Sequence, residues 1–254
     1  MAEEDRYARQ IDLPEIGKTG QRRLGKASVL VAGCGALGTN AAELLARAGI
    51  GRLRLVDFDR LERSNLQRQS LVRESDVGKA KAQVTAEALR AINAEITVEP
   101  QAARVTPETV EQLIAGVDLV MDGFDNLPAR YLLNDACVKH GIPWVFTAVA
   151  GTFGMTMPIL PGDGPCLRCI MPEPAPDEVV LTAGTAGLIN TIPRAVTAIA
   201  VTHALQILLD SFTPPVRLHT LDIWQGSLSA QDVARNPDCP CCGKGVYEFL
   251  SATD

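Results

Sequence analysis

Three glycines, Gly33, Gly35 and Gly38, directly follow the apolar run of residues 27–32 and precede a segment with helical spacing. Glycines at these spacings allow a tight turn, a close approach of the backbone to a phosphate, and close packing of a helix on a strand. The free N–H groups at the start of the helix can then bind an anion. The pattern predicts a strand-turn-helix unit that binds a nucleotide, but by itself it fits NAD, ATP or a purely structural turn.

Apolar runs typical of buried strands alternate with helix-like segments over the first 150 residues. Helices of this length can cross over between parallel strands, and such crossovers are right-handed. The expected strands are residues 29–32, 53–59, 95–101, 118–121 and 143–149, and the expected helices are residues 39–48, 79–92, 106–116 and 128–140. The sequence therefore predicts an α/β fold with a Rossmann-like, doubly wound parallel sheet.

The second part of the chain has a different order of elements. Strand-like segments at 155–160, 217–224 and 227–233 lie on either side of one long helix at 192–209. The last two segments are joined by a short turn, which predicts antiparallel pairing and hence an antiparallel C-terminal extension of the same sheet. No linker-like stretch divides the sequence, so we expect a single domain over residues 1–254.

Composition and charge limit the classes of function. The net charge of -6 at pH 7 and the pI near 5.2 leave no basic excess to displace counterions from a nucleic acid. The N-terminal residues are acidic, and no apolar stretch reaches membrane-spanning length, since residues 195–209 contain His203 and Gln206. We therefore expect a cytoplasmic protein that binds neither nucleic acid nor membrane.

Polar residues gather after the second predicted strand, at the carboxyl edge of the sheet. Asp57 is placed to accept hydrogen bonds from ribose hydroxyls. The motifs "SNLQRQ" and "VGKAKA" add Asn65, Arg68 and Lys81, and a triphosphate needs such groups more than a dinucleotide does. For any single Lys or Arg here, the alternative interpretation is a solvated basic loop.

Two carboxylates, Asp122 and Asp125, follow the strand expected at 118–121, in the motif "DGFDN". Either can hold Mg²⁺ through oxygen and present it to the phosphates. Asp125 has a second interpretation as a helix cap, because a helix is expected to begin at residues 126–128. The sequence leaves the choice of carboxylate and this alternative open.

Seven cysteines occur in a chain without an export signal, which favours metal or thiol chemistry over disulfides. The two CxxC pairs, Cys166/Cys169 and Cys239/Cys242, have the spacing of a closed tetrahedral zinc site. Four sulfur ligands leave no open position for water, so this zinc is expected to fasten the C-terminal segment rather than to catalyse. Cys241 is the alternative to Cys242 as a ligand, and the spacing favours Cys242.

Several motifs together resemble the MoeB/ThiF/HesA adenylyltransferases, bacterial relatives of the ubiquitin-activating enzymes, and are most similar to the MoeB type. They are "RYARQ", "GCGALG", "LVDFD", "SNLQRQ", "VGKAKA", "GFDN" with Arg130, and the paired CxxC, in the same order from Arg6 to Cys242. The resemblance implies a homodimer that binds ATP, Mg²⁺ and a structural Zn²⁺. It further implies adenylation of a C-terminal carboxylate, usually the Gly-Gly end of a small ubiquitin-like sulfur-carrier protein.

The resemblance also implies a role for each matching residue. Asp57 would bind ribose, Asp125 would bind magnesium, and Arg9 would reach the neighbouring subunit's site in trans. The nucleotide-binding part would be about 1–150, and the carrier-binding and zinc part about 151–254. The catalytic residues implied are Arg9, Asn65, Arg68, Lys81, Asp125 and Arg130, and the nucleotide-binding residues implied are Gly33, Gly35, Gly38, Asp57, Asp59 and Lys81.

The sequence departs from the wider family at two places. Ala183 stands where several members have an acyl-accepting cysteine, which predicts that the protein stops at the adenylate. Phe153 and Met155 make the segment 151–157 more apolar than usual, so the carboxylate of a small molecule or peptide is an alternative substrate. An inactive, zinc-stapled carrier-binding partner is a second alternative. No rhodanese-like segment follows Gly245, so sulfur is expected to come from a separate protein.

Overall fold

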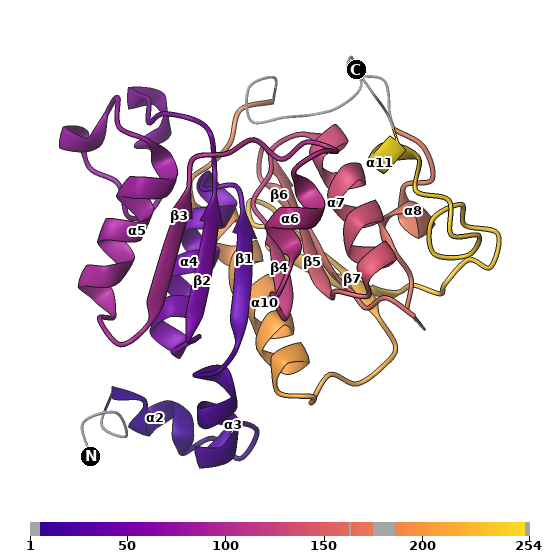
Figure 1. Ribbon diagram of the computed structural model, residues 1–254, viewed down its shortest axis with the longest axis horizontal. Helices are drawn as coiled ribbons and strands as arrows, with labels where there is room; N and C mark the ends of the chain where they lie inside the picture. The colour runs from indigo at the N-terminus through magenta and orange to yellow at the C-terminus, as the bar shows by residue number, and fades with distance from the viewer. Residues whose placement is uncertain (1–5, 163, 175–185, 252–254) are drawn as a thin grey trace.

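One mixed sheet organises the computed structural model, which describes residues 6–162, 164–174 and 186–251 (Figure 1). The strands are β1 (Ser28–Ala32), β2 (Arg52–Val56), β3 (Thr97–Gln101), β4 (Leu119–Asp122), β5 (Trp144–Ala150), β6 (Phe153–Ile159), β7 (Arg217–Asp222) and β8 (Ser227–Asp232). In the described residues they form an eight-stranded sheet in the order β3-β2-β1-β4-β5-β6-β7-β8. Strands β1 to β5 pair in parallel, and β6 to β8 continue the sheet antiparallel. The predicted doubly wound sheet and its antiparallel extension are confirmed.

Helices cover both faces of this sheet. They are α2 (Ala8–Ile11), α3 (Gly17–Leu24), α4 (Ala36–Ala48), α5 (Lys81–Ile92), α6 (Val110–Ile114), α7 (Leu127–His140), α8 (Leu167–Ile170), α10 (Thr191–Leu208) and α11 (Glu248–Ser251), with short 3-10 helices η1 (Arg63–Asn65) and η2 (Glu74–Asp76). On β1, Val29 and Val31 pack into one apolar cluster with α4, α5 and α10, whereas Leu30 and Ala32 pack into another with α6 and α7. Because both faces of β1 are buried, its sequence is a continuous apolar run.

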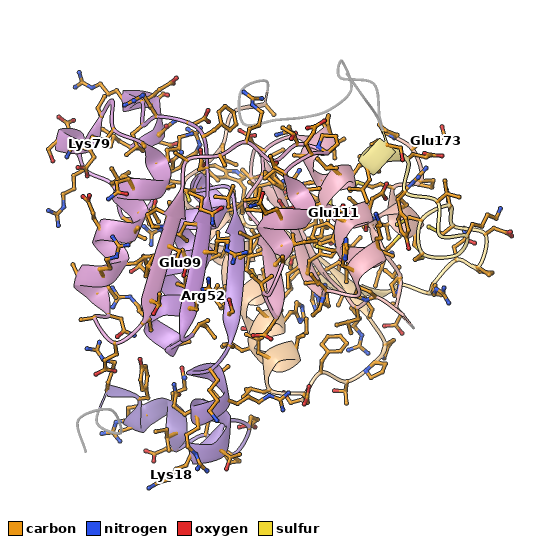
Figure 2. The ribbon with its side chains drawn as sticks, viewed as in Figure 1. Lys18, Arg52, Lys79, Glu99, Glu111 and Glu173 are labelled. Atoms are coloured by element: carbon orange, nitrogen blue, oxygen red, sulfur yellow. The ribbon has the colours of Figure 1, made fainter. Side chains whose placement is uncertain are left out.

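Strand β3 forms one edge of the sheet (Figure 2). The Arg52 guanidinium donates two hydrogen bonds, of 2.9 and 2.8 Å, to the Glu99 carboxylate of this strand. Pro100 is tolerated in β3 because an edge strand does not need every N–H for pairing. The polar cover and the proline both discourage pairing of this edge with another chain.

The N-terminal helices and one central helix differ from the sequence expectation. Helices α2 and α3 were not predicted, since they are short and polar, and they are held by contacts with a distant segment. The side-chain amides of Gln10 and Gln21 each donate to the Ala48 carbonyl at 3.0 Å. The helix expected at 106–116 is shorter, because Thr109 Oγ1 accepts from the Thr106 N–H at 2.9 Å and holds a turn before α6 begins at Val110.

The expectation that no apolar stretch is long enough to span a membrane is wrong for α10. This helix has 18 residues and a mean hydropathy of 1.2, enough by length and composition alone. In the described fold it packs against α4, β5 and β6, and Ile192, Val196 and Ala200 are fully buried. The expectation that this segment forms a buried helix is confirmed.

Gly38 is expected to be indispensable for stability. A Cβ atom at Gly38 would lie 1.8 Å from the Gly33 carbonyl oxygen, so Gly38→Ala should force the turn and α4 apart. We expect a loss of about 3 kcal/mol, or a melting temperature lower by about 10 °C, by thermal denaturation. Gly35→Ala is the matched control, since its Cβ would lie 3.8 Å from the nearest atom. Equal melting of the two variants would contradict this account of the turn.

Candidate active site

A cleft of about 1120 Å³ opens along the carboxyl ends of the parallel strands. Its walls come from the glycine turn after β1, the loops after β2 and β3, the start of α5, the end of β4, and the outer parts of β5 and β6. Of the residues predicted to act on nucleotide or magnesium, those lining it are Gly33, Gly35, Asp57, Asp59, Asn65, Arg68, Lys81, Asp125 and Arg130. The fold thus brings these residues together, but not Gly38 and Asp122, which are buried, or Arg9.

The Asp57 side chain, directly after β2, stabilises the glycine turn. One carboxylate oxygen accepts from the Cys34 N–H at 2.7 Å, and the other accepts from the Asp59 N–H at 2.7 Å. Burial raises the pKa of Asp57, and these two hydrogen bonds act against that shift. The carboxylate is therefore fixed beside the turn, at the position where the sequence predicts a ribose ligand.

Lys81 and Asp59 form an ion pair inside the cleft. The ammonium nitrogen of Lys81, the first residue of α5, lies 2.8 Å from Asp59 Oδ2. The Lys81 side chain is only 11% exposed, so its charge is held in a partly desolvated place. Asp59 was predicted as a nucleotide ligand; in the described structure its carboxylate holds this cation.

Asn65 and Arg68 line the same wall. The Asn65 side-chain oxygen accepts from the Glu62 N–H at 3.1 Å, which closes the short helix η1 and fixes the buried amide. Arg68 donates to the Ser64 carbonyl at 3.0 Å and remains partly exposed. Both side chains are thus oriented by the backbone of the loop after β2.

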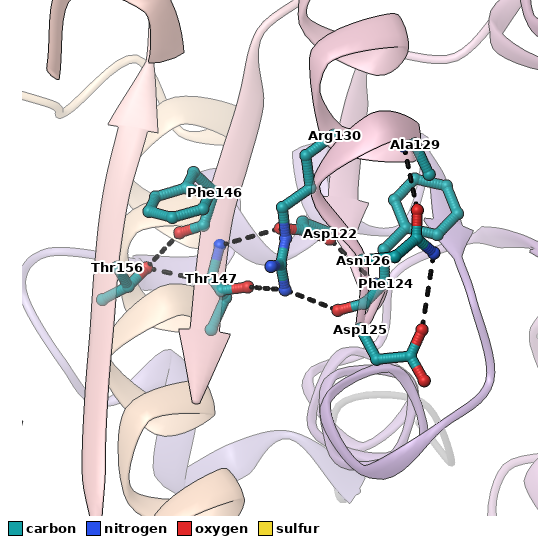
Figure 3. A network of polar contacts seen from close by, with 9 residues as sticks. All are labelled: Asp122, Phe124, Asp125, Asn126, Ala129, Arg130, Phe146, Thr147 and Thr156. Carbon is teal, nitrogen blue, oxygen red and sulfur yellow. Dashed lines mark hydrogen bonds and ion pairs between the residues drawn. The ribbon is translucent and has the colours of Figure 1, made fainter. Parts of the chain in front are cut away.

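The two candidate carboxylates after β4 differ in their surroundings (Figure 3). Asp122 is 1% exposed and accepts from Arg130 Nε at 2.8 Å. The Arg130 guanidinium also donates to the carbonyls of Phe124 and Thr147, at 2.5 and 2.9 Å. Burial raises the pKa of Asp122, and the charge of Arg130 opposes this shift. Asp122 is therefore engaged in a buried ion pair.

Asp125 is exposed at the mouth of the cleft. Its described contact is with Asn126 Nδ2, 3.4 Å from Asp125 Oδ1. Asn126, not Asp125, caps α7, because its side chain accepts from the Ala129 N–H at 3.0 Å. The interpretation of Asp125 as a helix cap is wrong, and of the two carboxylates it is the one with oxygens free for a cation.

Arg9 lies at the other end of the sheet from the cleft, on α2 below the strands (Figure 1). Its side chain is 99% exposed and 3.9 Å from Asp12. In one copy of the chain it does not line the cleft.

The remaining wall of the cleft is apolar. Phe153 and Met155 of β6 lie opposite Ala150 and Ala148 of β5 in the antiparallel register. All four side chains line the cleft, and Phe153 is 38% exposed. Two apolar side chains of the segment 151–157, those of Phe153 and Met155, therefore face the cleft.

The four predicted zinc ligands converge away from the cleft. The Sγ atoms of Cys166, Cys169, Cys239 and Cys242 all lie within 4.8 Å of one another. The Cys166–Cys239 and Cys169–Cys242 distances are 3.6 and 3.4 Å. Tetrahedral ligands 2.3 Å from Zn²⁺ would be about 3.8 Å apart, so this donor set fits zinc.

The surroundings of these thiols favour a metal ion. The hydrogen bond shared with Cys166, followed by burial, raises the pKa of Cys169 to about 12. Burial, followed by the hydrogen bond with Cys169, raises the pKa of Cys242 to about 11. A divalent cation relieves the repulsion between such crowded thiolates. Cys241 is instead buried against Asn134 Nδ2, 3.2 Å from its Sγ, and lies outside the cluster.

Comparison with known proteins identifies the family. The model of the ThiF family matches residues 7–241. The chain belongs to the ThiF family. It is 41% identical over 251 residues to the SAMP-activating enzyme E1 of Haloferax volcanii, covering 98% of this chain and 93% of that protein. It is 42% identical over 246 residues to the sulfur carrier protein adenylyltransferase of Thermus thermophilus, covering 94% and 90%.

The fold of this ThiF-family chain is also found among solved structures. The crystal structure of Escherichia coli MccB with ATP has a TM-score of 0.81, with 22% identity, and the match covers 94% of this chain and 74% of MccB. At this identity the likeness concerns the fold alone. The mixed sheet and its helical cover are therefore shared between the two proteins.

Several residues at the ThiF-family site were not expected from the sequence. Phe58 and Arg104 line the cleft after β2 and β3, and Phe249 of α11 reaches it from the C-terminal end. Phe249 stacks on Tyr131 at 4.9 Å between ring centroids. Phe58 belongs to the motif "LVDFD" but was given no role there, and Arg104 and Phe249 belong to none of the motifs found in the sequence. Ala183 lies outside the described residues, so its predicted consequence stays a prediction.

Proposed function

We propose that this chain is an ATP-dependent adenylyltransferase that activates the C-terminal carboxylate of a small ubiquitin-like sulfur-carrier protein ending in Gly-Gly. The observation that carries the proposal is the two-part cleft. One part holds the glycine turn with Lys81 and Asp125, and the other part is lined by apolar side chains that include Phe153 and Met155. The relatives named above, at about 40% identity, bear names for this activity.

The proposed reaction joins a carboxylate oxygen of the carrier to the α-phosphorus of ATP and breaks the bond to the pyrophosphate. Both partners are negatively charged, so alignment and neutralisation of charge must lower the barrier. Asp57 would hold the ribose, and Arg68, Lys81 and Asn65 would bind the phosphates. Asp125 would hold Mg²⁺, which supplies charge neutralisation at the departing phosphates.

Three of the cationic side chains have particular roles in this proposal. The ion pair with Asp59 orients the Lys81 ammonium before a nucleotide binds. On nucleotide binding, Lys81 would leave Asp59 and bind the phosphates instead. Arg9 would act in the cleft of a second copy, because it lies at the far end of its own sheet; the active form is then a homodimer. Arg130 would position Asp122 and the loop that carries Asp125.

The rest of the chain would support this site. A structural Zn²⁺ on Cys166, Cys169, Cys239 and Cys242 would fasten the C-terminal segment. The protein would act as a single domain in the cytoplasm, with nucleotide bound by residues of about 1–150 and carrier and zinc by residues of about 151–254. Adenylation of a small-molecule or peptide carboxylate is the second candidate, favoured by the apolar side chains of Phe153 and Met155 in the cleft.

Exchange of labelled pyrophosphate into ATP tests the proposal. We expect exchange that requires Mg²⁺ and a carrier, and no exchange with the same carrier after removal of its terminal Gly-Gly. Exchange driven by a metabolite or peptide, and by none of the carriers, would select the second candidate. Absence of exchange with every carboxylate tested would reject both.

A further inference from the structure

Phe58 and Arg104 form a cation–π pair at the edge of the cleft. The guanidinium carbon of Arg104 lies 3.8 Å from the centroid of the Phe58 ring. The Phe58 residue is 50% exposed, which is unusual for an aromatic side chain in a fold with few of them. Both residues line the cleft.

In the described part of the chain, no hydrogen bond or ion pair holds the Arg104 guanidinium in place. Among the described residues it has neither a carboxylate partner nor a carbonyl acceptor. Two other arginines of the cleft do have such acceptors, since Arg68 donates to the Ser64 carbonyl and Arg60 to the Gly78 carbonyl. The Arg104 guanidinium therefore contacts the Phe58 ring on one side, and among the described residues no hydrogen bond or ion pair occupies the other side.

The order of the strands relates this pair to the nucleotide. The glycine turn follows β1, Asp57 follows β2, and Arg104 follows β3, and these strands are neighbours in the order β3-β2-β1. A nucleotide with its phosphates at the turn and its ribose at Asp57 continues in the same direction, toward the loop after β3. Its base then arrives at Phe58, the residue after Asp57, and at Arg104.

We propose that Arg104 is a base-stacking residue: the purine of the nucleotide lies on the free face of its guanidinium, and Phe58 supports the opposite face. A planar guanidinium stacks well on π-systems, and an aromatic ring beneath it holds it flat. Stacking is insensitive to the pattern of hydrogen-bonding groups on the base, so this contact contributes affinity to purines in general. The inference rests on nucleotide binding in the proposed function, and it adds a residue to that site.

A comparison of ATP with a triphosphate that has no base separates the contribution of base stacking to affinity from that of charge. Dissociation constants of ATP and of ribose 5-triphosphate, both with Mg²⁺, are measured by calorimetry on the full-length, zinc-containing protein. We expect Arg104→Ala to weaken ATP about tenfold and ribose 5-triphosphate less than twofold. Arg104→Lys, which keeps the charge but loses the plane, should weaken ATP at least fivefold. Unchanged melting temperatures establish that the variants fold.

Two further variants complete the test. Phe58→Leu keeps apolar area but removes the ring, and it should weaken ATP about threefold with little effect on ribose 5-triphosphate. Arg63→Ala is the matched control, since Arg63 is 85% exposed and does not line the cleft. Equal weakening of both ligands by Arg104→Ala, or ATP affinity within twofold of wild type, overturns the inference. Failure of the wild type to bind either ligand would instead reject the proposed function.

Discussion

Replacing Asp125 with alanine is expected to lower the rate of adenylate formation by about a thousandfold while the fold remains intact. Loss of a magnesium ligand removes several kcal/mol of charge stabilisation, and each 1.36 kcal/mol corresponds to a factor of ten in rate. The side chain is exposed, and its described contact is a long one to Asn126. The melting temperature should therefore change by less than about 2 °C. Carrier-dependent pyrophosphate exchange and thermal denaturation measure the two effects.

Asp122, three positions earlier at the end of β4, provides the contrast. Asp122→Ala would leave Arg130 buried and without its carboxylate partner, which costs about 4 kcal/mol of stability. Glu74→Ala controls for the loss of a surface carboxylate, since the Glu74 side chain is 80% exposed. It should change neither the rate of adenylate formation nor the melting temperature. A rate lowered less than tenfold by Asp125→Ala, or melting as low as that of Asp122→Ala, would refute the assignment of magnesium to Asp125.

Replacing Cys166 with serine is expected to remove the zinc and to unfold the C-terminal segment. Cys166 is 1% exposed and has three thiols within 4.8 Å, so no water can replace the lost ligand without repacking. Metal binding and folding are coupled at such sites, and the loss of stability should exceed about 4 kcal/mol. Elemental analysis should give about one zinc for each wild-type chain and close to none for the variant. Limited proteolysis should cut the variant after residue 233.

Variants of Cys241 and Cys242 test which of these two thiols is a zinc ligand. Cys242→Ala should lose zinc as Cys166→Ser does, whereas Cys241→Ala should keep it, because Cys241 lies against Asn134. Retention of zinc by Cys242→Ala together with its loss from Cys241→Ala would reverse the assignment. Full zinc content in Cys166→Ser would reject the four-cysteine site.

Much of the fold was predictable because its signals are local. The buried strands are continuous apolar runs, and Gly49 and Gly141 end α4 and α7 in the left-handed conformation with φ of 83° and 67°. Helices α2 and α3 were missed because their stability comes from Gln10 and Gln21 binding the distant Ala48 carbonyl, for which no local pattern exists.

Most of the residues in the site were also predictable from the sequence, but the contacts between them were not. The strand-helix alternation carried Asp57, Lys81 and Asp125 to one edge of the sheet, as expected from parallel topology. The sequence could not tell that Asp59 would hold Lys81 or that Asn126 would cap α7. The first depends on a contact between side chains that are distant in sequence, and the second on which of two neighbouring side chains reaches the Ala129 N–H.

The sequence by itself determined the family, the order of the strands and of the helices between them, and most of the polar residues that reach the cleft, because apolar periodicity, glycine positions and motif spacing act over short stretches of chain. Only the tertiary structure decided which carboxylate is free for a cation, which thiol lies outside the four-cysteine cluster, and that Arg104 contacts Phe58. Burial and partner identity are properties of atoms brought together from distant segments, and they set the charge and availability of each group.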